Sequence, residues 1–365
     1  MKPLTILCSL LISITVGSSA LADLGDNAAL GYWQAFAQMP QLSDDERDRL
    51  PQWQQADIES QQVKQLLERS QSALKLLVAA AKEEACDWGL DESQGPQLLL
   101  PHLAKGRDLT RLAMLAARAK LAAGDADAAL AEIAASAKLA VDSGQPPLLV
   151  STLVERSMLR TIQDWISDSA AQLTKQQRAT LLAEFDSLFP PVKLSASMKA
   201  EAEIMLGWLK TEVDNPKFLD DLGVQSNAKL PTGKLFNSFM EKQILLLDED
   251  YQEMVAVSDG DFTTLKRTED KLISRAEEES RLLTSLLMPT MTRARIALNR
   301  SNVHTEMIRA GLLQLQGDTD AAHAVKEPEV DKPFKIQQAD GMLTITATAK
   351  QRDGSPRSVT FKLNQ

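Results

Sequence analysis

The sequence predicts a mainly α-helical protein built of stacked antiparallel helical hairpins, followed by a small C-terminal three-stranded antiparallel β-meander. Apolar residues recur every three or four positions over most of the 365 residues, which is the spacing of amphipathic helices. After Phe334 the pattern changes to alternation of apolar and polar residues, which is typical of strands. Aromatic residues make up only 4% of the chain, and alanine and leucine are abundant, so the helices are expected to pack closely.

The clearest hairpin is predicted over residues 96–145. Pro101 suits the first turn of a helix, where its missing N–H costs nothing. Gly124 is expected to end that helix and Asp125 to cap the next one. The expected buried faces are formed by Leu109, Leu112, Ala116 and Ala119 on the first helix and by Ala129, Ile133 and Ala137 on the second.

The same spacing predicts about ten helices in all. Asn27 is expected to cap the first helix, and Thr174 with Gln177 forms a capping-box pattern further along. The polar stretch 214–233 lacks periodicity, so a subdivision of the helical body is possible near 190–233. The other expected helices span 27–39, a short segment after Ser43, 58–82, 146–167, 174–189, 195–213, 234–257, 261–287, and a final helix that follows Pro289 and ends near Leu315.

The chain is expected to divide into a helical body, residues 23–325, and a C-terminal part, residues 326–365. The segment Glu327–Lys332 has the composition of a short charged linker. Asp340-Gly341 and Asp353-Gly354 then separate three alternating runs, which is a strong signal for two hairpin turns.

The first 22 residues have the pattern of a signal peptide. Lys2 supplies positive charge, an apolar run follows, and Ala20-Leu21-Ala22 is a small-residue cleavage site before Asp23. We therefore expect export to the periplasm or the extracellular space. No later stretch is apolar for long enough to span a bilayer, so no transmembrane segment is expected in the mature chain. Cys86 would be its one cysteine and is expected to be a buried free thiol.

Composition and motifs exclude several functions. The formal net charge of −10 and the pI near 5.0 argue against a nucleic-acid partner and against tight docking on anionic lipid. The three histidines have no metal-ligand spacing, so no metal is expected. The glycine-rich loops of nucleotide-binding proteins and the nucleophile elbow of hydrolases are missing, and no cofactor is expected.

Acidic clusters leave an enzymatic alternative open. Glu277–Glu279 and Asp248–Asp250 contain paired carboxylates of the kind that glycoside hydrolysis requires. Both are expected to be solvated helix faces. Ser258–Asp261 resembles part of a calcium loop but is better explained as a helix cap. His304 is expected to be solvated or salt-bridged.

One constellation predicts a ligand site, with no catalytic residue in it. Trp88 lies in the loop 86–97, and His102, Arg107 and Arg111 follow on the first helix of the hairpin. Arg107 and Arg111 are four residues apart, so they share a helix face on which two guanidiniums could hold a carboxylate or a peptide terminus. The alternative is a structural salt-bridge network that includes Asp108 and pins the loop.

The Gly124-Asp125 turn, with Ala129 and Ile133 after it, resembles one tetratricopeptide repeat, which implies an α-solenoid-like body. The segments NAALGYWQAFAQMP, CDWGLD, LLLPHLAKGRDLTRLAMLAARAKLAAGD and DKPFKIQQADG together resemble a family of exported, largely uncharacterised bacterial helical proteins. That resemblance implies export and a helical body and carries no catalytic residues. Asp331–Phe334 resembles the close of type II secretion pseudopilins, but the hydrophobic N-terminal pilin helix is missing.

From these patterns we expect an exported, non-enzymatic interaction protein. It would bind a peptide, a protein or an envelope component through a helical surface. The alternative is a hydrolase of envelope polymers whose carboxylates come together from distant helices.

Overall fold

The computed structural model describes residues 27–213, 215, 231, 233–328, 330–350 and 355–363. The predicted signal peptide and the Asp353-Gly354 turn lie outside these residues, as does most of the polar stretch 214–233. The α-helices are α1 (Ala28–Ala37), α2 (Asp44–Arg49), α3 (Gln61–Ala80), α4 (Pro101–Ala122), α5 (Ala126–Ser143), α6 (Leu149–Ser169), α7 (Lys175–Ala183), α8 (Phe185–Leu188), α9 (Leu194–Glu212), α11 (Lys234–Val257), α12 (Phe262–Glu278), α13 (Leu282–Leu287), α14 (Met291–Gln316) and α15 (Thr319–Ala324). The short 3-10 helices are η1 (Leu50–Gln55), η2 (Glu92–Gln97) and η3 (Ala170–Gln172). The strands are β1 (Lys326–Glu327), β2 (Lys332–Pro333), β3 (Lys335–Ala339), β4 (Met342–Lys350) and β5 (Pro356–Lys362).

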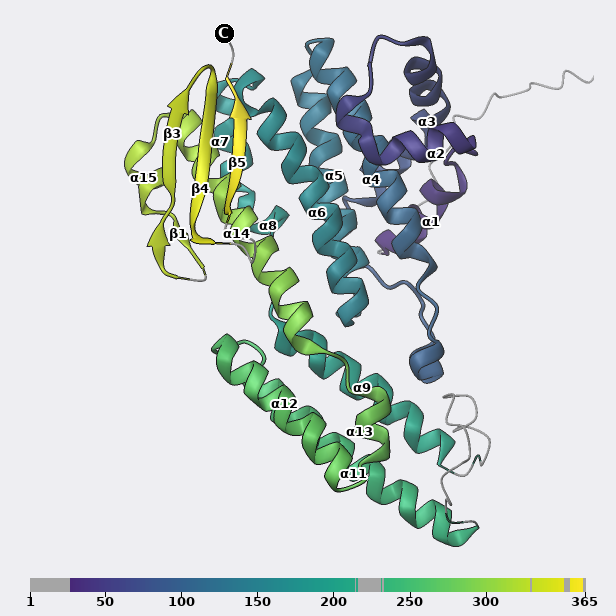
Figure 1. The fold of residues 1–365 in the computed structure, drawn as a ribbon. Coiled ribbons are helices and arrows are strands. Elements are labelled where there is room, and N and C mark those ends of the chain that lie inside the picture. Colours follow the sequence, from purple (N-terminus) through teal and green to yellow (C-terminus); the bar gives the residue numbers. More distant parts are fainter. Residues whose placement is uncertain are drawn as a thin grey trace, which may run out of the picture.

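The predicted fold class is confirmed: the described chain is mainly helical and ends in a three-stranded antiparallel sheet of order β3-β4-β5 (Figure 1). Asn27 caps α1, and Thr174 and Gln177 form the expected capping box of α7. The fourteen α-helices of the described residues exceed the ten or so expected. Part of the excess arises because the segments expected at 174–189 and 261–287 are each broken into two helices.

The hairpin of α4 and α5 turns at Gly124, which adopts a φ of +84°. The Gly124 N–H donates to the Leu121 carbonyl at 3.0 Å and the Asp125 N–H to the Lys120 carbonyl at 2.9 Å, so the last carbonyls of α4 are satisfied. The Asp125 carboxylate then accepts the Ala128 N–H at 3.1 Å and caps α5. The predicted turn is therefore confirmed in detail.

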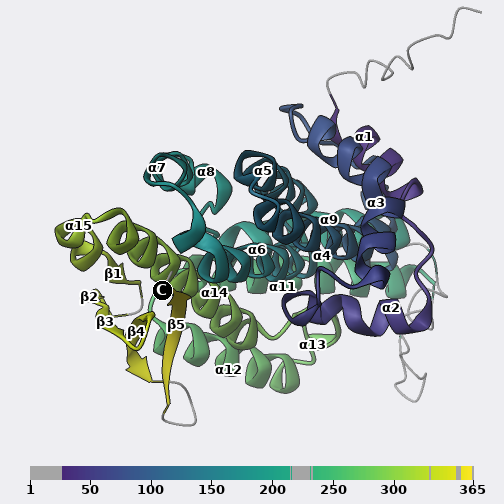
Figure 2. The same ribbon diagram turned by 90° about the horizontal axis from the view of Figure 1, so that it is seen from above.

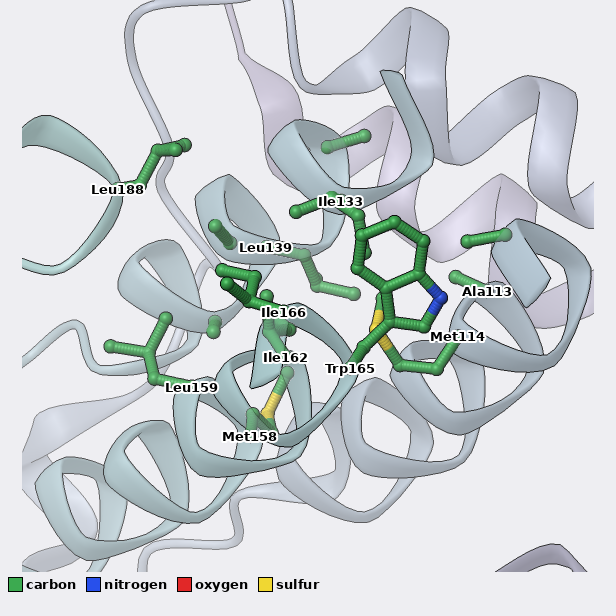
Figure 3. Packing of buried hydrophobic residues seen from close by; sticks show 14 of the residues in the cluster. Ala113, Met114, Ile133, Leu139, Met158, Leu159, Ile162, Trp165, Ile166 and Leu188 are labelled. Atoms are coloured by element: carbon green, nitrogen blue, oxygen red, sulfur yellow. The ribbon is translucent and has the colours of Figure 1, made fainter. Parts of the chain in front are cut away.

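Helix α6 packs against this hairpin and supplies its largest buried side chain. Trp165 is fully buried, and Figure 3 shows its ring among side chains that include Met114 of α4 and Ile133 of α5. Small alanines such as Ala113 let the helices approach closely around the ring (Figure 3). This packing fixes α4, α5 and α6 as a three-helix unit.

Buried apolar residues form two separate clusters. The first core is built by α1, α3–α6, α8, the C-terminal half of α14 and the β-sheet. The second core begins at Leu194 and is built by α9, α11, α12, α13 and the N-terminal half of α14. In Figures 1 and 2, α14 runs from the sheet toward α13 and connects the two groups of helices. The loop before α4 makes a further connection, because a Cβ at Gly95 would overlap the Trp208 ring of α9.

The prediction of one continuous helix over 261–287 is wrong, because the segment forms two helices, α12 and α13, with a break between them. Ser280 has a φ of +53°, in the left-handed region, and separates α12 from α13. The break turns Arg281 inward, where it donates to the Asp250 carboxylate at 2.9 Å. Asp250 is fully buried, so the expectation that residues 248–250 form a solvated face is also wrong for this residue.

The prediction that residues 327–332 form a charged linker is wrong for its first residue. Glu327 is fully buried. Its carboxylate accepts the Thr348 N–H at 2.8 Å and the Thr348 hydroxyl at 2.7 Å, which ties the segment to β4. The turn between β3 and β4 is as expected, with Asp340 and Gly341 both at positive φ, as a two-residue hairpin loop requires. Among the described helices, none is both long and apolar enough to cross a bilayer.

The sheet docks on α14 at Gly311, where an added Cβ would overlap the Phe361 ring of β5. We expect Gly311→Val to lower the free energy of unfolding by about 1–3 kcal/mol, the usual cost of overpacking a core. Gly207→Ala is the control, because a Cβ there meets nothing and alanine favours helix by up to about 1 kcal/mol. Urea unfolding of both variants measures this. An unchanged midpoint for Gly311→Val would show that the sheet does not depend on this contact.

Candidate functional site

Two of the four predicted site residues, Trp88 and His102, lie side by side in the interior. Their rings stack with centroids 4.4 Å apart and planes 19° from parallel. Trp88 belongs to the loop before η2 and His102 to the first turn of α4. The structure brings this aromatic half of the constellation together as a packed, buried pair.

Trp88 anchors the loop 86–97. Its indole N–H donates to the Asp142 carbonyl at 2.8 Å, and its ring stacks on Tyr32 and on Phe36 at centroid distances of 5.7 and 6.2 Å. Aromatic stacking and one buried hydrogen bond therefore hold the loop. Among the described residues, no ion pair joins an arginine of α4 to this loop, and Arg111 pairs with Asp108 on its own helix. The salt-bridge network of the alternative interpretation is therefore not what holds this segment.

Beneath the loop, the Asp142 carboxylate joins two helices. It accepts the Tyr32 hydroxyl of α1 at 2.9 Å and the Lys138 ammonium at 2.5 and 2.7 Å. Burial raises the pKa of this carboxyl despite the lysine. Burial, reinforced by the Asp142 charge, also raises the pKa of the half-buried Cys86 thiol to about 12. The thiol is therefore protonated at neutral pH, as a structural rather than a nucleophilic cysteine is.

His102 is a neutral, fully buried imidazole. Neither ring nitrogen has a hydrogen-bond partner of good geometry among the described residues. Burial lowers the pKa of His102 to about 4, and the Ser143 backbone acts weakly in the opposite direction. The imidazole thus serves as an aromatic partner of Trp88 and carries no charge at neutral pH.

The other two predicted residues, Arg107 and Arg111, lie on a different side of α4. At about 100° per residue, His102 and Arg107 are about 140° apart around the helix. Arg107 is exposed, and Arg111 pairs with Asp108 at 3.2 Å, as the spacing predicted. The structure therefore separates the arginines from the aromatic pair.

The low pKa of His102 generates a prediction about stability and pH. The unfolded chain takes up a proton at this histidine near pH 6.5, whereas the folded chain does so only near pH 4. The contribution of His102 to stability is complete above pH 6.5 and falls as the pH drops toward 4. His102→Phe keeps a stacked ring and removes this loss, about 2 kcal/mol between pH 7 and pH 4.5. Urea unfolding at the two pH values measures the difference, and equal losses in both proteins would contradict a buried neutral histidine.

Another cavity lies elsewhere, where the two cores meet. It has a volume of about 700 Å³, within the range of ligand sites. Its walls are the start of α9, the turn between α11 and α12, the middle of α14, and residues beside β1 and in β5. We call it the junction cavity; it is lined by Val192, Lys193, Leu194, Asp259, Gly260, Asp261, Phe262, Arg295, Ile296, Leu298, Asn299, Arg300, Asn302, Pro328, Val330 and Arg357.

The turn that forms one wall of the junction cavity is firmly held. Arg295 donates to the Ser258 carbonyl at 2.7 Å and to the next two carbonyls at 3.2 and 3.3 Å. The Asp259 carboxylate accepts the Ser195 N–H at 3.3 Å, so a residue of the turn supplies a hydrogen-bond acceptor for one of the first N–H groups of α9. Asp261 accepts the Thr264 N–H at 2.8 Å, which confirms that 258–261 is a helix cap.

The charge of the junction cavity is opposite to that of the whole chain. Four basic side chains and two acidic ones line it, whereas the chain has a formal net charge of −10. Lys193 and Arg300 are exposed, and neither has an ion-pair partner in the part of the chain that the structure describes. The cavity therefore favours an anionic group.

A second cavity, of about 600 Å³, lies between α2, η1 and α3. Its two arginines are already neutralised, because Arg49 pairs with Asp45 at 3.0 Å and Arg69 with Glu46. In the junction cavity Arg295 pairs with Asp259 at 3.6 Å, but Lys193 and Arg300 have no such partner among the described residues, and this difference distinguishes the two cavities.

A smaller cavity of about 200 Å³ adjoins the junction cavity. Both are lined by Asn302 and Pro328, so they meet along α14. The smaller cavity also contains Arg309, which bonds Glu306 at 3.1 Å and pairs with Asp186 of α8.

The remaining polar clusters have structural roles. Asp250 accepts from Arg275 at 2.5 Å and from Thr284 at 2.6 Å, besides Arg281. His304 is buried, with its Nε2 atom 3.7 Å from an Asp164 carboxylate oxygen. Of the two expectations for this residue, solvated or salt-bridged, the first is therefore wrong. Within the described ranges, no group of three histidine, cysteine or carboxylate side chains is placed to hold a metal ion.

Apart from the turn at 258–261, the residues of the junction cavity are not predicted by the apolar periodicity of the sequence. A polar stripe at helical period is nevertheless present, because Asn299, Asn302 and Glu306 follow Arg295 at spacings of four, three and four. The fold and cavities together define a two-core helical protein with a cationic cavity at the junction. Comparison of the chain with known protein families, curated proteins and solved structures found no match.

Proposed function

We propose that this chain is an exported interaction protein that binds an acidic peptide segment of a partner in the junction cavity. The observation that carries this proposal is the excess of basic side chains in the junction cavity of a strongly acidic chain. Export rests on the signal-peptide pattern of residues 1–22.

The walls of the cavity suit a peptide better than a small inorganic anion. Apolar side chains from three segments, including Val192, Ile296 and the 38% exposed Phe262, stand beside the basic ones. A ligand that fits must combine negative charge with apolar groups. A peptide with alternating acidic and apolar residues has this combination, because successive side chains of an extended chain point to opposite sides.

The carboxylates around the two cavities favour binding over hydrolysis. Asp259 and Asp261 accept backbone N–H groups at helix starts. Asp186 and Glu306 both pair with Arg309. Each carboxylate therefore already has a structural partner, whereas a hydrolytic pair must be free to face a substrate and a water.

Charge reversal tests the proposal. We expect Arg300→Glu to weaken binding of a fluorescein-labelled glutamate–valine alternating peptide about tenfold, or 1.4 kcal/mol, because an attractive charge becomes repulsive. Fluorescence anisotropy at low salt measures the affinity. Affinity of the unmodified protein is expected to fall as salt screens the charges.

Arg293→Glu is the matched control, because Arg293 is exposed on the same helix, does not line the cavity and changes the net charge equally. A lysine–valine peptide of the same length controls for the sign of the ligand. Equal binding of the two peptides, or equal effects of the two charge reversals, would exclude the junction cavity as an acidic-peptide site.

A further inference from the structure

The two cavities lie next to each other along α14, and we call the two together the groove. Asn302 and Pro328 line both of them, so the junction cavity and the smaller cavity are neighbours at this point. The groove runs from the turn at 258–261 to Arg309 near α8. One face of α14 contributes a row of polar residues to its lining, which we call the floor.

That floor is a polar stripe with an ionic group at each end. Five residues at spacings of four and three lie within about 80° of arc on α14. Arg295 and Arg309, at the two ends, are fixed by bonds to carbonyls and carboxylates of neighbouring segments. The distance along the helix axis between these ends is about 21 Å at 1.5 Å per residue. The stripe consists of Arg295, Asn299, Asn302, Glu306 and Arg309.

The middle of the stripe carries two side-chain amides that can hydrogen-bond the backbone of a bound peptide. Asn299 and Asn302 are partly exposed, and neither side chain bonds another residue of the described chain. A side-chain amide carries both a donor and an acceptor, as a peptide unit does. The two asparagines lie about one turn apart and can bond successive peptide groups of a chain laid along the helix.

The prolines of the side walls do not compete for those bonds. Pro190 and Pro191 form one wall of the smaller cavity, and Pro328 stands at the point where the cavities meet. Proline has no N–H to donate. The Pro190 carbonyl is already occupied by Arg156, which donates to it at 2.9 Å. The asparagines of the stripe, and not the prolines of the walls, are therefore the residues that can hydrogen-bond the backbone of a peptide in the groove.

We infer that the ligand of this groove is an extended peptide of about six residues, laid along α14, whose backbone bonds Asn299 and Asn302. This inference rests on the proposed function and names the form of its ligand. An extended chain rises about 3.3 Å per residue, so about six residues span the 21 Å of the stripe. The acidic end of the peptide lies in the junction cavity beside Lys193 and Arg300, where the cations lack partners among the described residues.

A length series tests the inference with the full chain. Labelled glutamate–valine peptides of three and six residues are titrated against the protein, and anisotropy gives each affinity. We expect the six-residue peptide to bind at least tenfold more tightly, because the three-residue peptide fills only the junction cavity. Methylating the central peptide nitrogens of the longer peptide is expected to remove most of that gain.

Two variants locate the gain at the meeting point of the cavities. Asn302→Trp blocks the groove there, so the six-residue peptide is expected to bind no better than the three-residue one. Asn302→Ala only removes the amide and is expected to weaken the longer peptide about fivefold. Ala297→Trp is the control, because Ala297 is exposed on α14 and lines neither cavity. Thermal melts show whether each variant is folded.

The outcomes separate the two proposals. Equal affinity of both peptides for the unmodified protein, with both weakened by Arg300→Glu, would overturn the extended groove and leave the acidic site standing. A gain with length that survives Asn302→Trp in a folded protein would also overturn the groove. Absence of binding by either peptide would overturn the proposed function itself.

Discussion

The packing of α14 into two hydrophobic cores is the constraint on which the rest of the structure depends. Its N-terminal half contributes Met291 and Leu298 to one core, and its C-terminal half contributes Val303 and Met307 to the other. A straight helix that passes from one core to another has a stretch that neither core covers. Polar side chains occupy that stretch, and the junction cavity opens over it. The position of the cavity therefore follows from the packing of α14 into two cores, whereas its charge follows from the side chains that line it.

A second connection between the cores is made by the loop 86–97. Trp88 fixes its first part in the first core through stacking and one hydrogen bond. Gly95 allows its second part to touch Trp208 of the second core, since any side chain there would overlap the indole. Trp88 at one end of the loop and Gly95 near the other therefore link the two groups of helices, whereas the groove lies on α14.

Local signals in the sequence predicted the elements, and distant contacts decided the rest. The caps at Asn27, Asp125 and Thr174 and the turn at Asp340-Gly341 depend on neighbours within four residues, and each is present. The break at Ser280 depends on burial of Arg281 against Asp250, which is 31 residues away in the chain. Glu327 is likewise buried by Thr348, a residue 21 positions away. Long-range burial of charge leaves no periodic signal. The sequence could therefore indicate the helices and the meander, but it could not show which helix faces form the cavity.

The charge distribution explains how an acidic chain can select an acidic segment. With a net charge of −10, most of the surface repels such a partner at long range. Near the junction cavity the balance reverses, because Lys193 and Arg300 have no counterions among the described residues. Because the rest of the surface repels an acidic peptide and the junction cavity attracts it, such a peptide can bind at few positions on the protein. Charge gives the location, while the amides of Asn299 and Asn302 require the ligand to present its backbone. Selectivity then depends on both conditions, since a compact anion meets only the first and a neutral peptide only the second.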